Sequence, residues 1–338
     1  MFEVAMILGY GVMVTLQILV LSFLVRVRVS QLHYSSILLK SKIGIWCNGN
    51  TTDSGPVIPG SSPGIPTREH LSFRKMLFSY IYLSVIGENI SFCCVFSKEK
   101  KVVVHYPNNE VFNPHPVDIK TNEQKGSFPS RRAAVAADNC ADMIFKDITF
   151  KTDCKGQAEG FLLNGERNYA ENVHVIGDGD ALQVNGSAYW LNCVIEGGGD
   201  TVLGRGPSYF NLCTLTSYGA FMWIRNTREN HGNIFNDCTF KGLGKDAVIA
   251  RLPDNKGRNY PDAECVLLNC TLDGVPAEGF GPIDESASTA KLLEFNSHDK
   301  EGKTIDISKR DKHVRQLDAI KDAETIGKYS NASWVLNW

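Results

Sequence analysis

The sequence predicts an all-β protein whose chain is wound as a parallel β-helix. Two stretches copy each other, Gly177–Leu182 and Gly197–Val202, and each carries Gly-Asp followed by apolar residues. Their aspartates, Asp180 and Asp200, are 20 residues apart, and a repeat of this length is typical of one coil of a solenoid. The thirty glycines agree with a fold that needs several tight corners in every coil.

Short strands of alternating character follow the same period. Asn172–Gly177 aligns with Asn192–Gly197, and later copies follow at Leu212, Asn236 and Asn269 with longer loops between them. Alternation along a strand buries every second side chain, and an asparagine beside the strand can bond the turn and recur as a ladder. Leucine-rich repeats have a similar length but need a dense leucine pattern, which is absent. We therefore expect coils of about 20–25 residues.

Composition and cysteine usage exclude several classes of function. The net charge of −2 comes without a basic stripe, which argues against a nucleic-acid partner. None of the ten cysteines forms a CxxC pair, which argues against a zinc or redox motif. Four of them precede an alternating strand in the same context, and we expect a column of small buried side chains rather than disulfides. These are Cys193, Cys213, Cys238 and Cys270, with Cys140 as a weaker fifth candidate.

The N-terminal third differs from the rest of the chain. Val4–Val25 is a run of 22 residues without a charge, long enough to cross a bilayer as a helix at ~1.5 Å per residue. Residues 43–67 are rich in Gly, Pro, Ser and Thr and show no strand or helix period. Two interpretations stay open for residues 1–97: a membrane anchor with a linker, or a segment that is not native to the domain at 98–338.

The repeated aspartates predict a shared site. Neighbouring coils lie ~4.8 Å apart, so the carboxylates of Asp180 and Asp200 should lie within about that distance. Two like charges so close separate the two pKa values, and one carboxyl can act as an acid while the other stays ionised. The alternative is that both aspartates only cap glycine-rich turns.

Two further residues fit a catalytic interpretation. Gln157 precedes Asp180 by 23 residues, which places it one coil earlier, and its amide can donate to a developing oxyanion. Arg251 follows an apolar strand and can pair with a carboxylate, which favours the ionised form. The alternatives are an exposed polar residue and a surface arginine.

Taken in order, these motifs resemble those of the pectinesterases (pectin methylesterases). The motifs are Gln157–Ala158, Gly179–Leu182, Ile195–Gly204 and Ala250–Pro253, with closing segments at Pro276–Phe280 and Leu293–Asn296. The resemblance covers roughly residues 98–338. It implies a right-handed parallel β-helix that acts as a carbohydrate esterase.

The resemblance also implies roles for single residues. Asp200 matches the family's nucleophile, Asp180 its general acid/base, Gln157 an oxyanion-hole glutamine, and Arg251 the arginine that holds the nucleophile. The implied reaction is hydrolysis of methyl esters in pectin with release of methanol, with neither metal nor organic cofactor. A secreted or extracytoplasmic monomer is expected, or a membrane-anchored one if residues 4–25 are a genuine anchor.

The chain departs from the family pattern in two places. The family's second glutamine, just before the acid/base, is Gly179 here, and loss of one oxyanion donor costs ~10²–10³ in rate. The tryptophan that follows the arginine is also absent, because Leu252 and Pro253 follow Arg251.

Four other residues are predicted to bind substrate. Trp223 or Tyr260 can supply an aromatic platform, while Arg205 and Arg225 can bind a substrate carboxylate. Arg225 also competes with Arg251 for the role of the nucleophile's partner.

Three alternative functions remain at this level. A polygalacturonase-like enzyme would use His231-Gly232, but it needs carboxylates ~6.5–9.5 Å apart, farther than stacked Asp180 and Asp200. A calcium-dependent lyase would need more clustered acids. Gly179 favours an inactive or sugar-binding β-helix.

Overall fold

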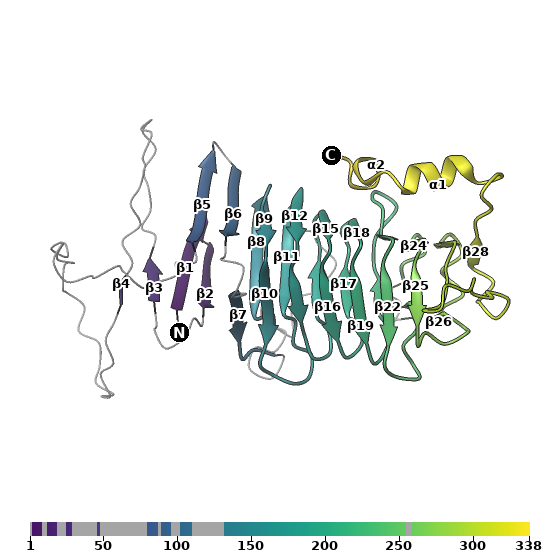
Figure 1. Ribbon diagram of the computed structural model, residues 1–338, viewed down its shortest axis with the longest axis horizontal. Helices are drawn as coiled ribbons and strands as arrows, with labels where there is room; N and C mark the ends of the chain where they lie inside the picture. Colours follow the sequence, from purple (N-terminus) through teal and green to yellow (C-terminus); the bar gives the residue numbers. More distant parts are fainter. Residues whose placement is uncertain are drawn as a thin grey trace.

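The computed structural model describes residues 102–109, 132–254 and 259–338 with their side chains, apart from the side chains of 138 and 139 (Figure 1). Of the preceding residues it describes the backbone of strands β1–β6. The six strands are β1 (Phe2–Leu8), β2 (Val12–Ile18), β3 (Val25–Arg28), β4 (Trp46–Cys47), β5 (Tyr80–Ile86) and β6 (Asn89–Val95). Within the apolar segment, β1 and β2 pair as antiparallel strands. Among the described residues, no helix is both long and apolar enough to cross a membrane. The domain boundary near residue 97 and the membrane anchor stay predictions.

From β7 onward the chain builds three sheets of parallel strands. The first holds β7 (Val102–Tyr106), β10 (Ile148–Thr152), β13 (His174–Ile176), β16 (Val194–Gly197), β19 (Thr214–Ser217), β22 (Thr239–Gly242) and β25 (Thr271–Asp273). The second holds β8 (Val135–Ala141), β11 (Phe161–Glu166), β14 (Leu182–Val184), β17 (Val202–Gly204), β20 (Met222–Ile224), β23 (Ala250–Leu252) and β26 (Phe280–Ile283). The third holds β9 (Ile144–Lys146), β12 (Asn168–Glu171), β15 (Ala188–Leu191), β18 (Ser208–Asn211), β21 (Asn233–Asn236), β24 (Glu264–Leu268), β27 (Lys291–Phe295) and β28 (Val314–Gln316).

The chain visits the three sheets in turn, and each strand pairs with its counterpart one coil later (Figure 1). Leu182 pairs with Val202, and Ala188 pairs with Ser208, so the 20-residue repeat of the sequence is one coil of the structure. The predicted parallel β-helix is confirmed. Parallel pairing between coils satisfies the backbone groups of every inner strand.

The corners of the coils explain the repeated asparagines. Asn172 and Asn192 adopt left-handed φ values of 54° and 51°, a conformation that asparagine tolerates better than most residues. The amide nitrogen of Asn192 donates to Oδ1 of Asn172 at 2.7 Å. Asn236 and Asn296 donate in the same way one coil back, to Asn211 and Asn269. The predicted asparagine ladder is confirmed.

Aromatic rings and the cysteine column fill the interior. Phe210 stacks on Phe235 with ring centroids 4.7 Å apart, and the stack continues to Trp190. Cys193, Cys213, Cys238 and Cys270 are buried free thiols, so the prediction of a buried column without disulfides is confirmed. Each of these thiols lies against a backbone carbonyl two residues earlier, as Cys193 does with Leu191 at 3.3 Å. Cys140, the weaker candidate, is only partly buried.

Two short helices follow β28, namely α1 (Ala323–Tyr329) and α2 (Ala332–Leu336). Figure 1 shows them lying along one side of the helix of strands. Tyr329, Val335 and Leu336 pack with Tyr209 and Ile234 of the third sheet in a separate apolar cluster. The second sheet, which carries the predicted site, lies away from this cluster.

Candidate active site

Asp180 and Asp200 occupy the same place on adjacent coils. Each lies two residues before its strand in the second sheet, and the register of those strands pairs Leu182 with Val202. Their side chains are only 12% and 15% exposed, so both carboxyls are largely shielded from solvent. The structure therefore brings together the two aspartates that the sequence repeat singled out.

Arg251 holds the carboxylate of Asp200 at two points. Its Nε donates to Oδ1 at 2.6 Å, and its Nη2 donates to Oδ2. Arg251 comes from β23, two coils further on, where it pairs in register with Trp223. Its guanidinium carbon lies 4.9 Å from the centre of the Trp223 ring, a cation–π contact that braces the arginine. A two-point arginine contact favours a charged carboxylate, the form that acts as a nucleophile.

Asp180 has a different environment. Its carboxyl is buried, and Nη2 of Arg132 donates to Oδ2 at 3.2 Å. Burial is the largest cause that raises the pKa of Asp180 to about 7, and the charge of Glu159 adds to the rise while Arg132 opposes it. A carboxyl that titrates near neutral pH can both give and accept a proton there. The two aspartates thus have separate environments: Asp180 lies beside Arg132 and Glu159, whereas Asp200 is paired with Arg251.

Gln157 lies one coil before Asp180 and is exposed. Its Oε1 accepts a hydrogen bond from Nη1 of Arg132, while Nη2 of Arg132 donates to Oε1 of buried Glu159. Neither Arg132 nor Glu159 was predicted from the sequence as a site residue. Two features of the sequence could have pointed to these residues. Glu159 lies two residues after Gln157, and Arg132 precedes Gln157 by 25 residues, about one coil.

The four residues predicted to bind substrate lie close together, around Trp223 and Tyr260. Nη2 of Arg205 donates to the hydroxyl of Tyr260 at 3.4 Å. The ring of Tyr260 meets that of Trp223 edge to face, with centroids 6.5 Å apart. Arg205, Tyr260 and Trp223 therefore form a connected group beside Arg251.

Arg225 differs from its prediction. It is only 4% exposed, and its guanidinium carbon lies 4.5 Å from the centre of the Trp223 ring. Burial also lowers the pKa of Arg225. Direct contact with a polysaccharide, as the sequence analysis expected, requires a surface position that Arg225 does not have. Of the two competing arginines, Arg251 makes the ion pair with Asp200.

A cleft of about 610 Å³ opens beside Asp200 and Arg251. Its wall includes charged and apolar residues from the loops and strands of later coils, which the sequence analysis did not assign. They include Lys245, Asp246, Glu278, Phe280 and Pro282. Asp200 and Arg251 both line this cleft.

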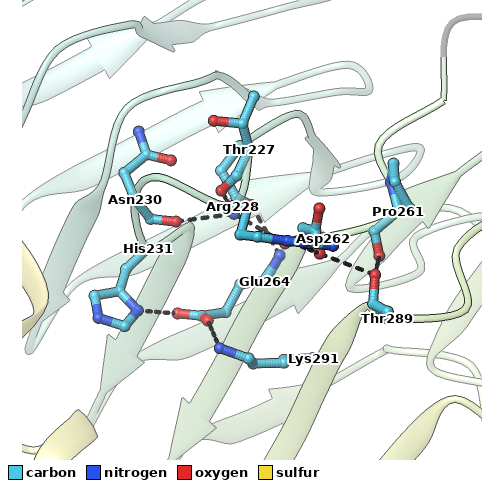
Figure 2. Close-up of polar contacts among 10 residues, drawn as sticks. Thr227, Arg228, Asn230, His231, Pro261, Asp262, Glu264, Thr289 and Lys291 are labelled. Atoms are coloured by element: carbon cyan, nitrogen blue, oxygen red, sulfur yellow. Dashed lines mark hydrogen bonds and ion pairs between the residues drawn. The ribbon is translucent and has the colours of Figure 1, made fainter.

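The described residues hold no group of three or more His, Cys, Asp or Glu side chains that could bind a metal ion. His231, the residue that suggested a polygalacturonase, belongs to another cluster (Figure 2). Its Nδ1 lies 2.7 Å from Oε1 of Glu264, whose Oε2 accepts from Lys291 at 3.1 Å. The His231 ring is 4.2 Å from that of Trp334, centre to centre. His231 therefore contacts the C-terminal helices and the third sheet.

Known proteins with similar sequences are pectinesterases. The chain is 25% identical over 177 residues to a pectinesterase of Ralstonia solanacearum, a match that covers 41% of the chain and 45% of the relative. It is 28% identical over 193 residues to pectinesterase 1 of Olea europaea, covering 53% and 50%. The chain therefore resembles the pectinesterases in sequence, as its motifs predicted. It spans about half the length of these pectinesterase relatives, and no protein-family profile matches it.

Solved pectin methylesterases share the fold. The enzyme from carrot superimposes with a TM-score of 0.55 at 15% identity, over 70% of this chain and 73% of the carrot chain. The enzyme from Yersinia enterocolitica gives a TM-score of 0.52 at 17% identity, over 70% and 84%. These likenesses support the parallel β-helix as the fold of this chain.

Gly179 is the position where the pectinesterase pattern has its second glutamine. A Cβ atom at Gly179 would lie 2.9 Å from the carbonyl oxygen of Gly156, closer than real Cβ contacts. The backbone N–H of Gly179 donates to that same oxygen at 2.8 Å. At the matching position one coil later, a Cβ on Gly199 would meet its nearest atom, Cα of Gly219, at 3.6 Å. Because the 156 and 179 backbones approach so closely, a side chain at 179 would require the backbone to shift.

Proposed function

We propose that this protein hydrolyses the methyl esters of galacturonate units in pectin and releases methanol. The observation that carries the proposal is the pairing of Asp200 with Arg251 one coil from Asp180, a buried carboxyl that titrates near pH 7. A charged nucleophile beside a group that exchanges protons at neutral pH is the arrangement that ester hydrolysis needs. The pectinesterase relatives name the substrate class.

In the first half of the reaction, an oxygen of Asp200 attacks the carbonyl carbon of the ester. The C=O electron pair moves to the oxygen and forms a tetrahedral oxyanion, to which the amide of Gln157 can donate. The oxyanion collapses, the bond to the methoxy group breaks, and the proton of Asp180 passes to the leaving oxygen. Methanol leaves, and the galacturonyl group is bound to Asp200 as an anhydride.

In the second half, water restores the enzyme. The ionised Asp180 takes a proton from water as the water oxygen attacks the galacturonyl carbonyl. The bond to Asp200 breaks, and the electron pair returns to its carboxylate, which pairs again with Arg251. The product is a galacturonate carboxylic acid that loses its proton to solvent, so one ester and one water yield one acid and one methanol.

The group beside Arg251 supports a sugar substrate. Trp223 and Tyr260 present aromatic rings, and Arg205 supplies a cation next to Tyr260. Galacturonate units combine an apolar ring face with a carboxylate, which aromatic and arginine side chains bind. We propose that the cleft lined by Lys245 and Glu278 extends this binding along the polysaccharide. An extracytoplasmic location, where pectin is found, remains part of the proposal.

The test uses the full chain and methyl-esterified polygalacturonate. Methanol and new carboxylic acid groups are measured in parallel, and the proposal expects one of each per turnover, without new reducing ends. Reducing ends without methanol would replace the proposal by a polygalacturonase-like activity. Retention on immobilised pectin with neither product would identify a binding β-helix instead.

A further inference from the structure

Arg132 lies at the centre of a polar group that includes Asp180. Its guanidinium donates to three side chains: Gln157, Glu159 and Asp180. The side chain of Arg132 is 10% exposed and that of Glu159 is 1% exposed. A buried guanidinium that reaches three acceptors at once holds all of them in fixed directions, because its donors form a rigid planar fork.

We propose that Arg132 is a positioning residue for ester hydrolysis. It orients the amide of Gln157 and the carboxyl of Asp180 beside position 179, where Gly179 has no side chain to do so. The proposal rests on the function proposed above. Gly156 and Gly179, which flank Gln157 and Asp180 in the chain, already touch through their backbones. Arg132 adds a side-chain link between the same two segments, where the family pattern has a second glutamine.

The contact with Gln157 decides which end of the amide is free. A carboxamide has one oxygen acceptor and one nitrogen donor. Because Nη1 of Arg132 donates to Oε1, the nitrogen is the end that remains to donate to an oxyanion. Without the guanidinium, the amide can rotate and present its oxygen, which would repel the developing negative charge.

Glu159 anchors the arginine. Its Oε1 accepts from Arg132, and its Oε2 is buried without a hydrogen-bond partner among the described residues. Burial raises the pKa of Glu159. The charge of Glu159 raises the pKa of Asp180, and the charge of Arg132 lowers it. Arg132 and Glu159 therefore set the proton affinity of Asp180 in opposite directions.

The experiment measures kcat, KM and the pH profile of methanol release for Arg132→Ala, Arg132→Lys and Glu159→Gln in the full chain. For Arg132→Ala we expect kcat to fall about 10²-fold, the scale of one lost preorganised donor, with little change in KM. The basic limb of the pH profile is the fall of kcat/KM at high pH, where Asp180 loses its proton. In Arg132→Ala this limb should move to higher pH, because Asp180 loses a cation that favours its ionised form. Arg132→Lys should keep the limb near that of the wild type while kcat stays low, because an ammonium lacks the planar fork.

Glu159→Gln should move the basic limb to lower pH, and Arg315→Ala is the matched control. Arg315 forms an exposed ion pair with Asp322 in the C-terminal region, and its loss should leave both kcat and the limb unchanged. Thermal unfolding checks that each variant folds. If Arg132→Ala does not fold, two results decide: a low kcat with an unchanged limb in Arg132→Lys, and a limb moved to lower pH in Glu159→Gln.

The outcomes separate the two proposals. A wild-type chain that releases no methanol contradicts the proposed function. If the wild-type chain releases methanol, two results contradict the role of Arg132 alone. In the first, the folded Arg132 variants keep kcat within about threefold of the wild type. In the second, they lose kcat but no variant moves the basic limb. Such results would leave Arg132 as a structural contact.

Discussion

Asp200 and Arg251, 51 residues apart in the chain, meet through two hydrogen bonds between carboxylate and guanidinium. Trp223, from the coil between them, lies against the guanidinium. The pair is therefore built by three successive coils of the second sheet. Its geometry depends on how those coils stack, and its chemistry depends on the charge that Arg251 keeps on Asp200.

Replacing the nucleophile should abolish the proposed activity. We expect Asp200→Asn to lower kcat for methanol release by at least about 10⁴-fold, because an amide is a poor nucleophile in place of a carboxylate. Far-ultraviolet circular dichroism should show the fold unchanged. Asp142→Asn is the matched control: Asp142 shares a left-handed φ with Asp200 but forms an exposed ion pair with Arg167. Retained activity in Asp200→Asn would remove Asp200 from the mechanism.

Breaking the pair from the arginine side should cost stability. Arg251→Ala leaves the carboxylate of Asp200, only 15% exposed, without its partner, and we expect a loss of about 1–3 kcal/mol in the free energy of unfolding. In the double variant with Asp200→Asn, much of this loss should return, because no uncompensated charge remains. Urea unfolding of the four members of the cycle measures the coupling. Additive losses would mean that the ion pair adds nothing to stability.

The raised pKa of Asp180 makes stability depend on pH. The folded protein binds this proton up to about pH 7, whereas the unfolded chain releases it near the ordinary value of 3.8. Between these values the folded state holds more protons, so this carboxyl lowers stability as pH rises. Asp180→Asn should remove that fall and raise the free energy of unfolding by about 1–3 kcal/mol at pH 8, with little change at pH 4. Denaturant titrations at both pH values test this, and Asp142→Asn should show no gain.

A side chain at position 179 should destabilise the site. Gly179→Ala places a Cβ 2.9 Å from the carbonyl oxygen of Gly156, and we expect a loss of about 1–3 kcal/mol because the backbone must shift. Gly199→Ala, at the equivalent place one coil later, should be tolerated, since its nearest atom is 3.6 Å away. Thermal unfolding compares the two variants. Equal stability in both would mean that the 156 segment yields easily, and Gly179→Gln would then be worth assaying for a gain in rate.

The cluster around Glu264 should stabilise the C-terminal helices (Figure 2). Burial pushes the pKa of Glu264 up, but His231 and Lys291 together bring it below its ordinary value of 4.5. The ionised carboxylate therefore adds stability above pH 4.5, and this is lost as pH falls through the lowered pKa. Glu264→Gln should cost about 1–3 kcal/mol at pH 7 and less at pH 3, measured by urea unfolding. Glu324→Gln, which breaks an exposed pair with Lys328, should have no measurable effect.

Several features of the fold were predictable because they are periodic. Three features recur once in each coil. They are the Gly-Asp repeat of 20 residues, the asparagines next to the strands and the cysteine column. Repetition then carries each local preference to the next coil, where like residues stack. This is why the sequence placed Asp180 and Asp200 side by side and kept the cysteines free of disulfides.

The rest of the site depends on contacts that do not repeat. Arg225 and Arg251 both come after apolar residues in the sequence, and no pattern there shows that Arg225 contacts Trp223 while Arg251 contacts Trp223 and also reaches Asp200. Arg132 lies before the region where the repeat becomes visible, so its contact with Asp180 had no periodic signal. The cleft beside Lys245 also comes from loops of unequal length, which periodicity does not position.

The sequence by itself therefore determined the coil, the pair of aspartates and the resemblance to pectinesterases, because these follow from residue types and their spacing along one chain. Only the tertiary structure decided which arginine binds Asp200, that Arg132 joins Gln157 to Asp180, and that Asp180 titrates near pH 7. The physical reason is that burial and charge pairing depend on every side chain that surrounds a group. Those neighbours come from different coils, and the sequence alone does not show which way each side chain points.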